Sequence, residues 1–336
     1  HLSLRRQRQM CIRDRFETFT TNNGTARFLD GVSKGMGNFT NQVTGLIELA
    51  GASAFYGLGN SNITNDGIIK KTGSGSTSFL FGNFHNNGTI QADSGTLKLG
   101  KSSDPNDNNR YSGNWTSAIL NASLGANIDI FGNYNFNNSN TASPTLSGTG
   151  TGRINLQGNL GLYSGPAVSI NFTQGLFQLD GGTIQGNSTS RFINQTSGHL
   201  SIGANGGSLY SIINQGTIVA QNITFNTNLI NDASGTIVLD GTSSMVASGN
   251  NIITSNGTIR KTGAGTAYIL GGNGLNITSG TIRAEAGTLQ LGSNTTNEST
   301  GDWSSVNFVA LSGALIDING RYFLREGTFS GSCLLY

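Results

Sequence analysis

The sequence predicts an all-β protein that folds as a single-stranded parallel β-helix, or β-solenoid, with about 20 residues per coil. Three observations lead to this prediction. The composition is unsuited to helices, short segments alternate strictly between apolar and polar residues, and a strand-starting motif recurs at the spacing of one coil.

The composition excludes a helical protein. The chain has 50 glycines and only 3 prolines, and Asn and Thr are abundant. We find no window with convincing apolar spacing at i, i+3, i+4 and i+7, which is the pattern of an amphipathic helix. Nor is there an apolar run of the length that spans a membrane.

Alternating polarity marks the strands, because successive side chains of a strand point to opposite faces. In Gly88–Gly100 and in the later segment Gly280–Gly292, two such strands flank a short turn. The residues expected to face inward are Ile90, Ala92, Leu97, Leu99, Ile282, Ala284, Leu289 and Leu291. Those expected to face outward are Gln91, Thr96, Lys98, Arg283, Glu285 and Gln290.

The motif Gly-Thr-Ile sets the coil length. It begins at Gly88, Gly182, Gly216, Gly235, Gly257 and Gly280, and the last four are separated by 19, 22 and 23 residues. This spacing suits two or three short strands with their corners. One such coil cannot bury its apolar face alone, so neighbouring coils must stack on it. At the corners we expect Gly and Asn because both tolerate positive φ.

An antiparallel arrangement is the alternative, because Asn-Gly between apolar runs is also a hairpin signal. A string of immunoglobulin-like sandwiches would need a turn every 8–12 residues or so. The motif spacing is about twice that, and a Cys-Trp-Cys core is missing. The parallel solenoid is therefore favoured.

A long duplication underlies the shorter period. The segment Asn65–Gly100 reappears as Ser255–Gly292. The match continues with Trp115 and Trp303, Gly125 and Gly313, Tyr134 and Tyr322, and Leu146 and Phe329. We interpret 16–332 as one solenoid without a domain boundary, made of one unit of about 190 residues and a truncated second copy.

The two ends differ from the rest of the chain. Residues 1–15 contain five arginines, and their RRQRQMCIRDR resembles a translated sequencing-library adapter; residues 333–336, CLLY, resemble the companion adapter. We therefore treat both as artefactual ends of a metagenomic fragment, with a basic arm for nucleic acid or lipid head groups as the alternative for 1–15. Without the ends, the charge changes from +2 to −2, and both cysteines, Cys11 and Cys333, are lost. Nothing then points to nucleic acid or a disulfide.

Two sequence motifs, KTGAGT at Lys261 and GTLQLG at Gly287, are similar to motifs of a known class of repeat protein. Across most of 16–332 the chain resembles the long repeat proteins that bacteria secrete, including autotransporter passenger repeats and haemagglutinin-type adhesins. The resemblance implies a right-handed parallel β-helix on the cell surface or outside the cell. Right-handedness agrees with the general preference of parallel crossover connections.

Candidate chemical sites are sparse. His85 and His199 stand in unrelated contexts, and we interpret them as corner or surface residues. Asp104, Asn106 and Asn108 alternate as calcium ligands do, but Asn109 and Trp115 stand where a calcium loop needs Gly and Glu. We therefore expect no catalytic, cofactor-binding or metal-binding residues and no cofactor.

Three repeated features have two interpretations each. Asp129 and Asp317 are either outward strand residues or part of a cluster of Asp, Lys and Arg from neighbouring coils, like that of pectin-type β-helix lyases and hydrolases. In Lys70–Lys71 and Arg260–Lys261, either the first residue faces water and the second ends the strand with its long stem covering the coil edge, or the pairs form a stripe for polyanions. Trp115 and Trp303 either pack a loop onto the solenoid or serve as sugar platforms. The structural interpretation is favoured for each.

The functional hypothesis is a structural or adhesive repeat segment of a large secreted or cell-surface bacterial protein. It would act as a spacer or as an extended binding surface for surface glycans or other cell-surface proteins. The alternative is a carbohydrate-active β-helix that cleaves or binds a polysaccharide. We also expect the open ends of the solenoid to self-associate, because they expose unpaired strand edges.

Overall fold

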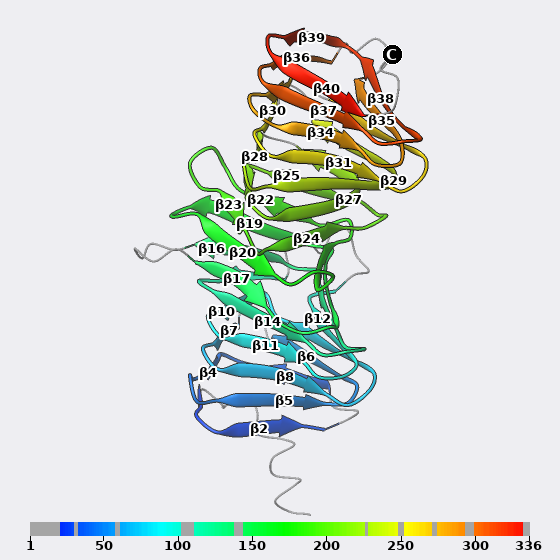
Figure 1. Ribbon diagram of the computed structural model, residues 1–336. Helices are drawn as coiled ribbons and strands as arrows, with labels where there is room; N and C mark the ends of the chain where they lie inside the picture. Colours follow the sequence, from blue (N-terminus) through cyan, green and yellow to red (C-terminus); the bar gives the residue numbers. More distant parts are fainter. Residues whose placement is uncertain are drawn as a thin grey trace, which may run out of the picture. The chain divides into compact units, whose positions relative to one another are not determined.

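The computed structural model confirms the predicted fold class. It describes residues 21–29, 33–57, 61–101, 111–137, 144–225, 228–247, 252–270, 274–292 and 299–331. These residues contain only strands, turns and irregular segments, and the strands stack in parallel as a β-solenoid (Figure 1). Each turn has roughly 22 residues, which is slightly longer than the coil expected from the motif spacing.

The chain divides by compactness into two units. The first unit comprises His1–Asn137 and Thr145–Asn159, and the second comprises Asn138–Pro144 and Leu160–Tyr336. Each unit is a stack of coils in which every coil contributes strands to three columns, and strands in a column pair in parallel with those of the next coil.

The first unit has three columns of six strands each. One column contains β2 (Thr25–Phe28), β5 (Leu46–Ala50), β8 (Ile68–Thr72), β11 (Thr89–Ala92), β14 (Ala118–Ala122) and β17 (Thr145–Gly148). Another contains β3 (Ser33–Met36), β6 (Ser53–Gly57), β9 (Ser76–Leu80), β12 (Thr96–Leu99), β15 (Asn127–Ile130) and β18 (Arg153–Leu156). The third contains β1 (Thr21–Asn22), β4 (Phe39–Asn41), β7 (Asn62–Asn65), β10 (Asn83–Asn86), β13 (Ser112–Asn114) and β16 (Asn133–Asn137).

The second unit repeats this plan with eight strands in each column. One column contains β20 (Val168–Phe172), β23 (Phe192–Asn194), β26 (Ile212–Asn214), β28 (Leu229–Asn231), β30 (Ile252–Ser255), β33 (Gly274–Ile277), β36 (Thr300–Trp303) and β39 (Arg321–Leu324). Another contains β21 (Phe177–Leu179), β24 (His199–Ile202), β27 (Thr217–Phe225), β29 (Thr236–Ala247), β31 (Thr258–Thr262), β34 (Thr281–Ala284), β37 (Val306–Ala310) and β40 (Gly327–Gly331). The long strands β27 and β29 continue into the third column, together with β19 (Asn159–Ser164), β22 (Thr183–Gln185), β25 (Gly207–Tyr210), β32 (Thr266–Leu270), β35 (Gly287–Gly292) and β38 (Ala314–Asn319).

The recurring Gly-Thr-Ile motif starts strands that lie directly on one another. In the second unit, Thr217, Thr236, Thr258 and Thr281 are register partners in consecutive coils, and each following isoleucine is fully buried. The alternation is also confirmed: all eight side chains that were expected to face inward are 0% exposed. The motif spacing therefore does measure one coil.

The expected role of the corner residues was wrong in part. Among the described residues other than Gly, positive φ occurs at Ser211 and Ser305, and at no asparagine. The glycines that follow the asparagines, such as Gly88 and Gly257, do not adopt left-handed φ either. They are required because an added β-carbon would overlap backbone oxygens of the preceding coil, Gly67 O and Gly235 O respectively. Positive φ is concentrated instead at other turns, for example Gly263 and Gly265 in KTGAGT.

Within the part of the chain that the structure describes, no helix is long and apolar enough to cross a membrane.

Candidate functional site

A ladder of buried asparagines runs through the second unit. Asn194, Asn214 and Asn231 end β23, β26 and β28, and are fully buried and in register. The Asn194 Nδ2 donates to Asn214 Oδ1 at 2.8 Å, and Asn214 Nδ2 donates to Asn231 Oδ1 at 2.8 Å. Asn231 Nδ2 then donates to Ser255 Oγ at 3.0 Å, which ends the ladder. Each amide thus links its own coil to the next one.

The first unit contains an equivalent ladder. Asn22, Asn41, Asn65 and Asn86 are consecutive register partners in β1, β4, β7 and β10. Their Nδ2-to-Oδ1 distances are 2.8, 2.7 and 2.7 Å. The next coil places Trp115 opposite Asn86, so an aromatic side chain replaces the amide there.

These ladders fix the register of the coils. The linked asparagines are 17 to 24 residues apart, so coil length varies in the connecting turns while the ladder remains aligned. A buried amide hydrogen bond contributes about 1 kcal/mol net, and leaving one partner unsatisfied costs more. Sequence reasoning missed this role; a signal was the Asn two residues before the strand-starting Gly in NDG, NNG and NQG, at Asn65, Asn86 and Asn214.

The second lysine of each repeated basic pair lies inside the solenoid. Lys71 and Lys261 are 0% exposed and occupy inward positions of β8 and β31. Lys261 has Leu239 and Ala284 as its register partners in the neighbouring coils. Its Nζ donates to the carbonyl oxygens of Thr262 and Gly263 at 2.5 and 2.6 Å. The long stem therefore fills the interior, and the ammonium group closes the KTG turn.

Lys71 makes the same contacts in the first unit. Its Nζ donates to Thr72 O at 2.8 Å and to Gly73 O at 2.6 Å. The sequence suggested that the stem of this lysine covers the edge of the coil. The structure buries the side chain in the interior instead. Because the ammonium groups are directed to carbonyls of their own turn, these two lysines do not belong to an outward cationic stripe.

The buried lysine predicts a pH dependence. Burial lowers the pKa of Lys261 below its ordinary value of 10.5, although the carboxylate of Asp240 acts in the opposite direction. When the folded pKa is depressed, the unfolded chain binds more protons between the two pKa values, so stability rises with pH in that window. We expect the free energy of unfolding of the protein to rise relative to that of Lys261→Met as the pH approaches 10.5.

Urea unfolding of both proteins over this alkaline range would measure the difference. Comparison with Lys261→Met cancels the contributions of the tyrosines, which both proteins share. Lys98→Met is the matched control, since Lys98 is half-exposed and faces outward on β12. Parallel stability curves for the protein and Lys261→Met would contradict the assignment.

The two tryptophans are interior packing residues. Trp115 is 0% and Trp303 is 2% exposed, which leaves neither indole face accessible to a sugar ring. Trp115 stacks on Tyr134 with a centroid distance of 4.6 Å, and Trp303 stacks on Tyr322 at 4.0 Å. The structure therefore supports the packing interpretation, although the rings lie in the core and do not hold a surface loop.

A glycine two positions before each tryptophan makes room for this stack. Gly113 is the register partner of Tyr134, and Gly301 is the register partner of Tyr322. A β-carbon on Gly301 would overlap Leu275 O of the preceding coil and would also lie 3.0 Å from Tyr322 Cδ1, and one on Gly113 would overlap Phe84 O. Burial raises the pKa of Tyr322 to about 12 and that of Tyr134 further still.

The first residue of each repeated basic pair, Lys70 and Arg260, forms an ion pair on the outward face. Lys70 Nζ lies 2.6 Å from Asp93 Oδ2. Burial alone would raise the pKa of Asp93, but hydrogen bonds from Lys70 and Gln91 outweigh it and hold the pKa below its usual value. In the second unit, Arg260 and Arg283 share Glu285, with distances of 3.6 and 2.7 Å. The repeated basic positions are thus balanced by carboxylates, which weakens the case for a polyanion-binding stripe.

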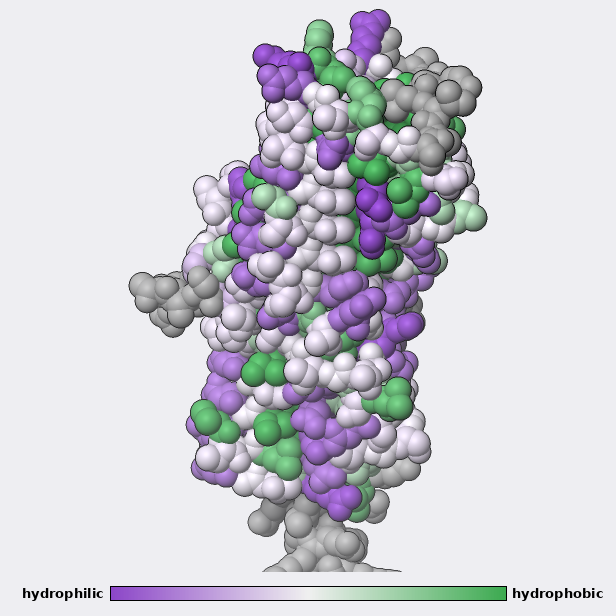
Figure 2. Space-filling view, in the orientation of Figure 1, coloured by the Kyte–Doolittle hydropathy of each residue, from purple (hydrophilic) through white to green (hydrophobic). Residues whose placement is uncertain are grey.

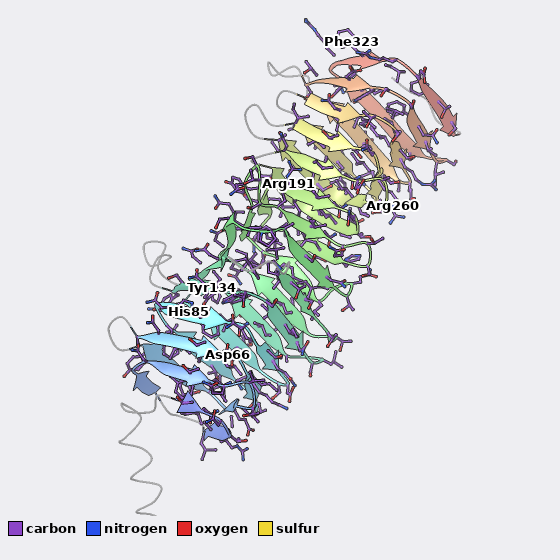
Figure 3. All side chains as sticks on the ribbon, turned by 90° about the vertical axis from the view of Figure 1, so that its left-hand side faces the viewer. Asp66, His85, Tyr134, Arg191, Arg260 and Phe323 are labelled. Atoms are coloured by element: carbon purple, nitrogen blue, oxygen red, sulfur yellow. The ribbon has the colours of Figure 1, made fainter. Side chains whose placement is uncertain are left out.

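The remaining sequence candidates lie apart from one another. His85 is on β10 and accepts a hydrogen bond at Nδ1 from Asn114 N, at 3.3 Å (Figure 3). His199 begins β24 in the other unit, where burial lowers its pKa. Asp129 is an outward residue of β15 that accepts a hydrogen bond from Asn155 Nδ2, at 2.8 Å. Asp317 is the register partner of Gln290.

No group of three or more His, Cys, Asp or Glu side chains that could hold a metal ion is found within the described ranges. The calcium candidates Asp104, Asn106 and Asn108 lie outside those ranges, as do Cys11, Cys333, residues 1–15 and residues 333–336. The outward surface itself is polar: the face drawn in Figure 2 is mainly white and purple, with apolar residues scattered over it.

The repeated polar groups hold neighbouring coils together: amides inside, and outside ion pairs and hydroxyl–amide hydrogen bonds such as that from Thr278 Oγ1 to Asn256 Oδ1. The result is a regular polar surface around a core whose coils are linked by side-chain hydrogen bonds. In the comparison with known proteins, no family model, no curated protein and no solved structure matches the chain.

Proposed function

We propose that this chain is a structural repeat segment of a large secreted or cell-surface bacterial protein, where it serves as a spacer that presents an extended binding surface. Surface glycans or other cell-surface proteins are the partners that such a surface would meet. The proposal is consistent with the sequence resemblance to secreted repeat proteins and with the absence of cysteine from 16–332.

One observation carries the proposal: distinctive polar and aromatic residues recur in both units, where they either link neighbouring coils or close a turn within a coil. The asparagine ladders, the lysines that close the KTG turns and the Trp–Tyr stacks all occur twice. A catalytic centre depends on a single convergent group of side chains at one place. Residues that repeat with the coils are instead what a uniform scaffold needs.

A carbohydrate-active β-helix is the other class of function for this fold. It would bring acidic and basic side chains from adjacent coils together on one face. Asp129 and Asp317 lie in different units, and each is the only acidic residue of its strand. The scaffold is therefore the better-supported function.

The distance that the chain spans from the cell surface distinguishes a spacer from a carbohydrate-active enzyme. The full chain, as one copy or two copies in tandem, would be inserted between a bacterial surface anchor and an epitope. For a spacer, we expect the distance of the epitope from the membrane, measured by fluorescence localisation, to increase with the second copy. The Gly257→Ala variant, whose coils are destabilised, is the control and should give a shorter and more variable distance.

The same purified chain would be incubated with a panel of bacterial and host polysaccharides. We expect retention on some of them without new reducing ends or unsaturated products. An unchanged epitope distance with two copies, or catalytic release of oligosaccharides, would contradict the proposal.

A further inference from the structure

The strands β38, β39 and β40 form one end of the second unit, which we call the end face. In the described part of the chain, each of them has a hydrogen-bonded strand on one side only, namely β35, β36 and β37 (Figure 1). A one-sided edge of this kind exposes backbone donors and acceptors to any further strand.

The end face exposes apolar side chains whose counterparts in the first repeat are buried. Leu324 is 42% exposed, whereas Phe136, at the matching position of the duplication, is 0% exposed. Phe329 is 52% exposed, whereas its counterpart Leu146 is 0% exposed. Phe323, on the same strand as Leu324, is 74% exposed (Figure 3). The exposed side chains of the end face are therefore of the apolar type that a neighbouring coil covers in the first repeat.

The first unit shows which strand covers the counterpart of β38. That counterpart is β15, and it pairs in parallel with β18, so that Ile128 faces Ile154 and Ile130 faces Leu156. The corresponding residues on β38 are Ile316 and Ile318. Arg153 N donates to Ala126 O at 3.0 Å and Gln157 N donates to Ile130 O at 2.8 Å, which closes both ends of this pairing.

We propose that the end face is a stacking site for one further parallel coil, and that the coil it fits has the sequence type of Gly150–Phe172, with its Arg153–Leu156 strand on β38. This goes beyond a scaffold role, because it assigns a specific partner sequence to one surface. The apolar positions Ile154 and Leu156 would continue the interior rows of Ile316 and Ile318.

The described first coil of a second copy is a poorer match. Its Asn22 corresponds in sequence to Asn214, which lies against another asparagine, Asn194, and accepts a hydrogen bond from it. The end face offers Leu324 and Phe329 and no buried asparagine. A second copy stacked head to tail would thus give Asn22 Oδ1 no amide donor from the end face, so the bond that Asn214 Oδ1 receives would be missing, and the 3.3 Å bond from Gly24 N would remain. The sequence suggested that any open end would self-associate. We instead expect the end face to bind only a coil whose strands match the next position in the duplication.

Three proteins test the proposal: residues 1–332, the same chain followed by a copy of 150–172, and the same chain followed by 21–43 as a length-matched, out-of-phase control. Residue 332 precedes residue 150 because Phe329 matches Leu146 in the duplication. Hydrogen exchange of the amides in β38–β40 would be measured by mass spectrometry. We expect the in-phase coil to slow exchange at least about ten-fold and the out-of-phase coil to leave it within about two-fold.

A register-specific disulfide provides an independent measurement. Cys11 would be replaced by Ser in all variants, and Ile318→Cys would be combined with Cys at the copied position of Leu156. Neighbouring strands hold such partners about 4.8 Å apart, within the range for a disulfide. We expect this pair to oxidise, and the pair of Ile318→Cys with the copied Ile154 position to remain reduced. Equal protection by both coils, protection by neither, or oxidation of both cysteine pairs would overturn the proposal.

Discussion

Substitution of Gly257 by Ala should lower the free energy of unfolding by about 3 kcal/mol, which is at the upper end of overpacking effects. The β-carbon would overlap the carbonyl oxygens of Gly235 and Asp232 in the preceding coil. Neither oxygen can move freely, because Gly235 O accepts from Thr258 N at 2.9 Å. The two coils would have to separate, which weakens the hydrogen bonds on both sides of the turn.

Urea unfolding followed by circular dichroism would measure this loss. Gly274→Ala is the matched control in the same unit, since Gly274 has no left-handed φ and its β-carbon would meet Asn276 Oδ1 at an ordinary 3.4 Å. That substitution should change the free energy of unfolding by less than about 1 kcal/mol. If the two variants are equally stable, the close approach of coils at Gly257 is not what selects glycine there.

Substitution of Asn214 by Ala should lower the free energy of unfolding by about 2–4 kcal/mol, because it disrupts the middle of a buried ladder. The change removes the donor to Asn231 Oδ1 and the acceptor for Asn194 Nδ2. It also removes the bond from Asn214 Nδ2 to Thr236 O, at 3.2 Å. Both neighbouring amides would remain buried with unsatisfied groups, and water has no access to replace the lost partner.

The control for the ladder is Asn222→Ala. Asn222 is exposed on β27, and its Nδ2 makes a 3.4 Å contact with Ala204 O. We expect a loss below about 1 kcal/mol for this outward residue. A double variant, Asn194→Ala with Asn214→Ala, should lose less than the sum of the single losses, because the two residues share a bond. Additive losses would show that the ladder does not act as a connected unit.

Two features of the fold could be predicted from the sequence because they depend on local rules. Alternation along Gly88–Gly100 determined which side chains face inward, since the period of a strand is two. The repetition of Gly-Thr-Ile determined the coil length, since identical strands stack best in register. Both favoured parallel stacking over an antiparallel arrangement, because a single coil of this size cannot bury Ile259 and its equivalents alone.

The interior polar positions were decided by the tertiary structure alone. From the sequence, Lys261 and Trp303 belonged to the surface or its loops, because charged and large aromatic residues usually do. Their burial depends on neighbours one coil away: Leu239 and Ala284 beside the lysine stem, and Tyr322 against the indole. Asn214 was expected at a corner for its backbone freedom, but its side chain forms the ladder. Such roles require the spatial register between coils, which residue spacing within one coil does not contain.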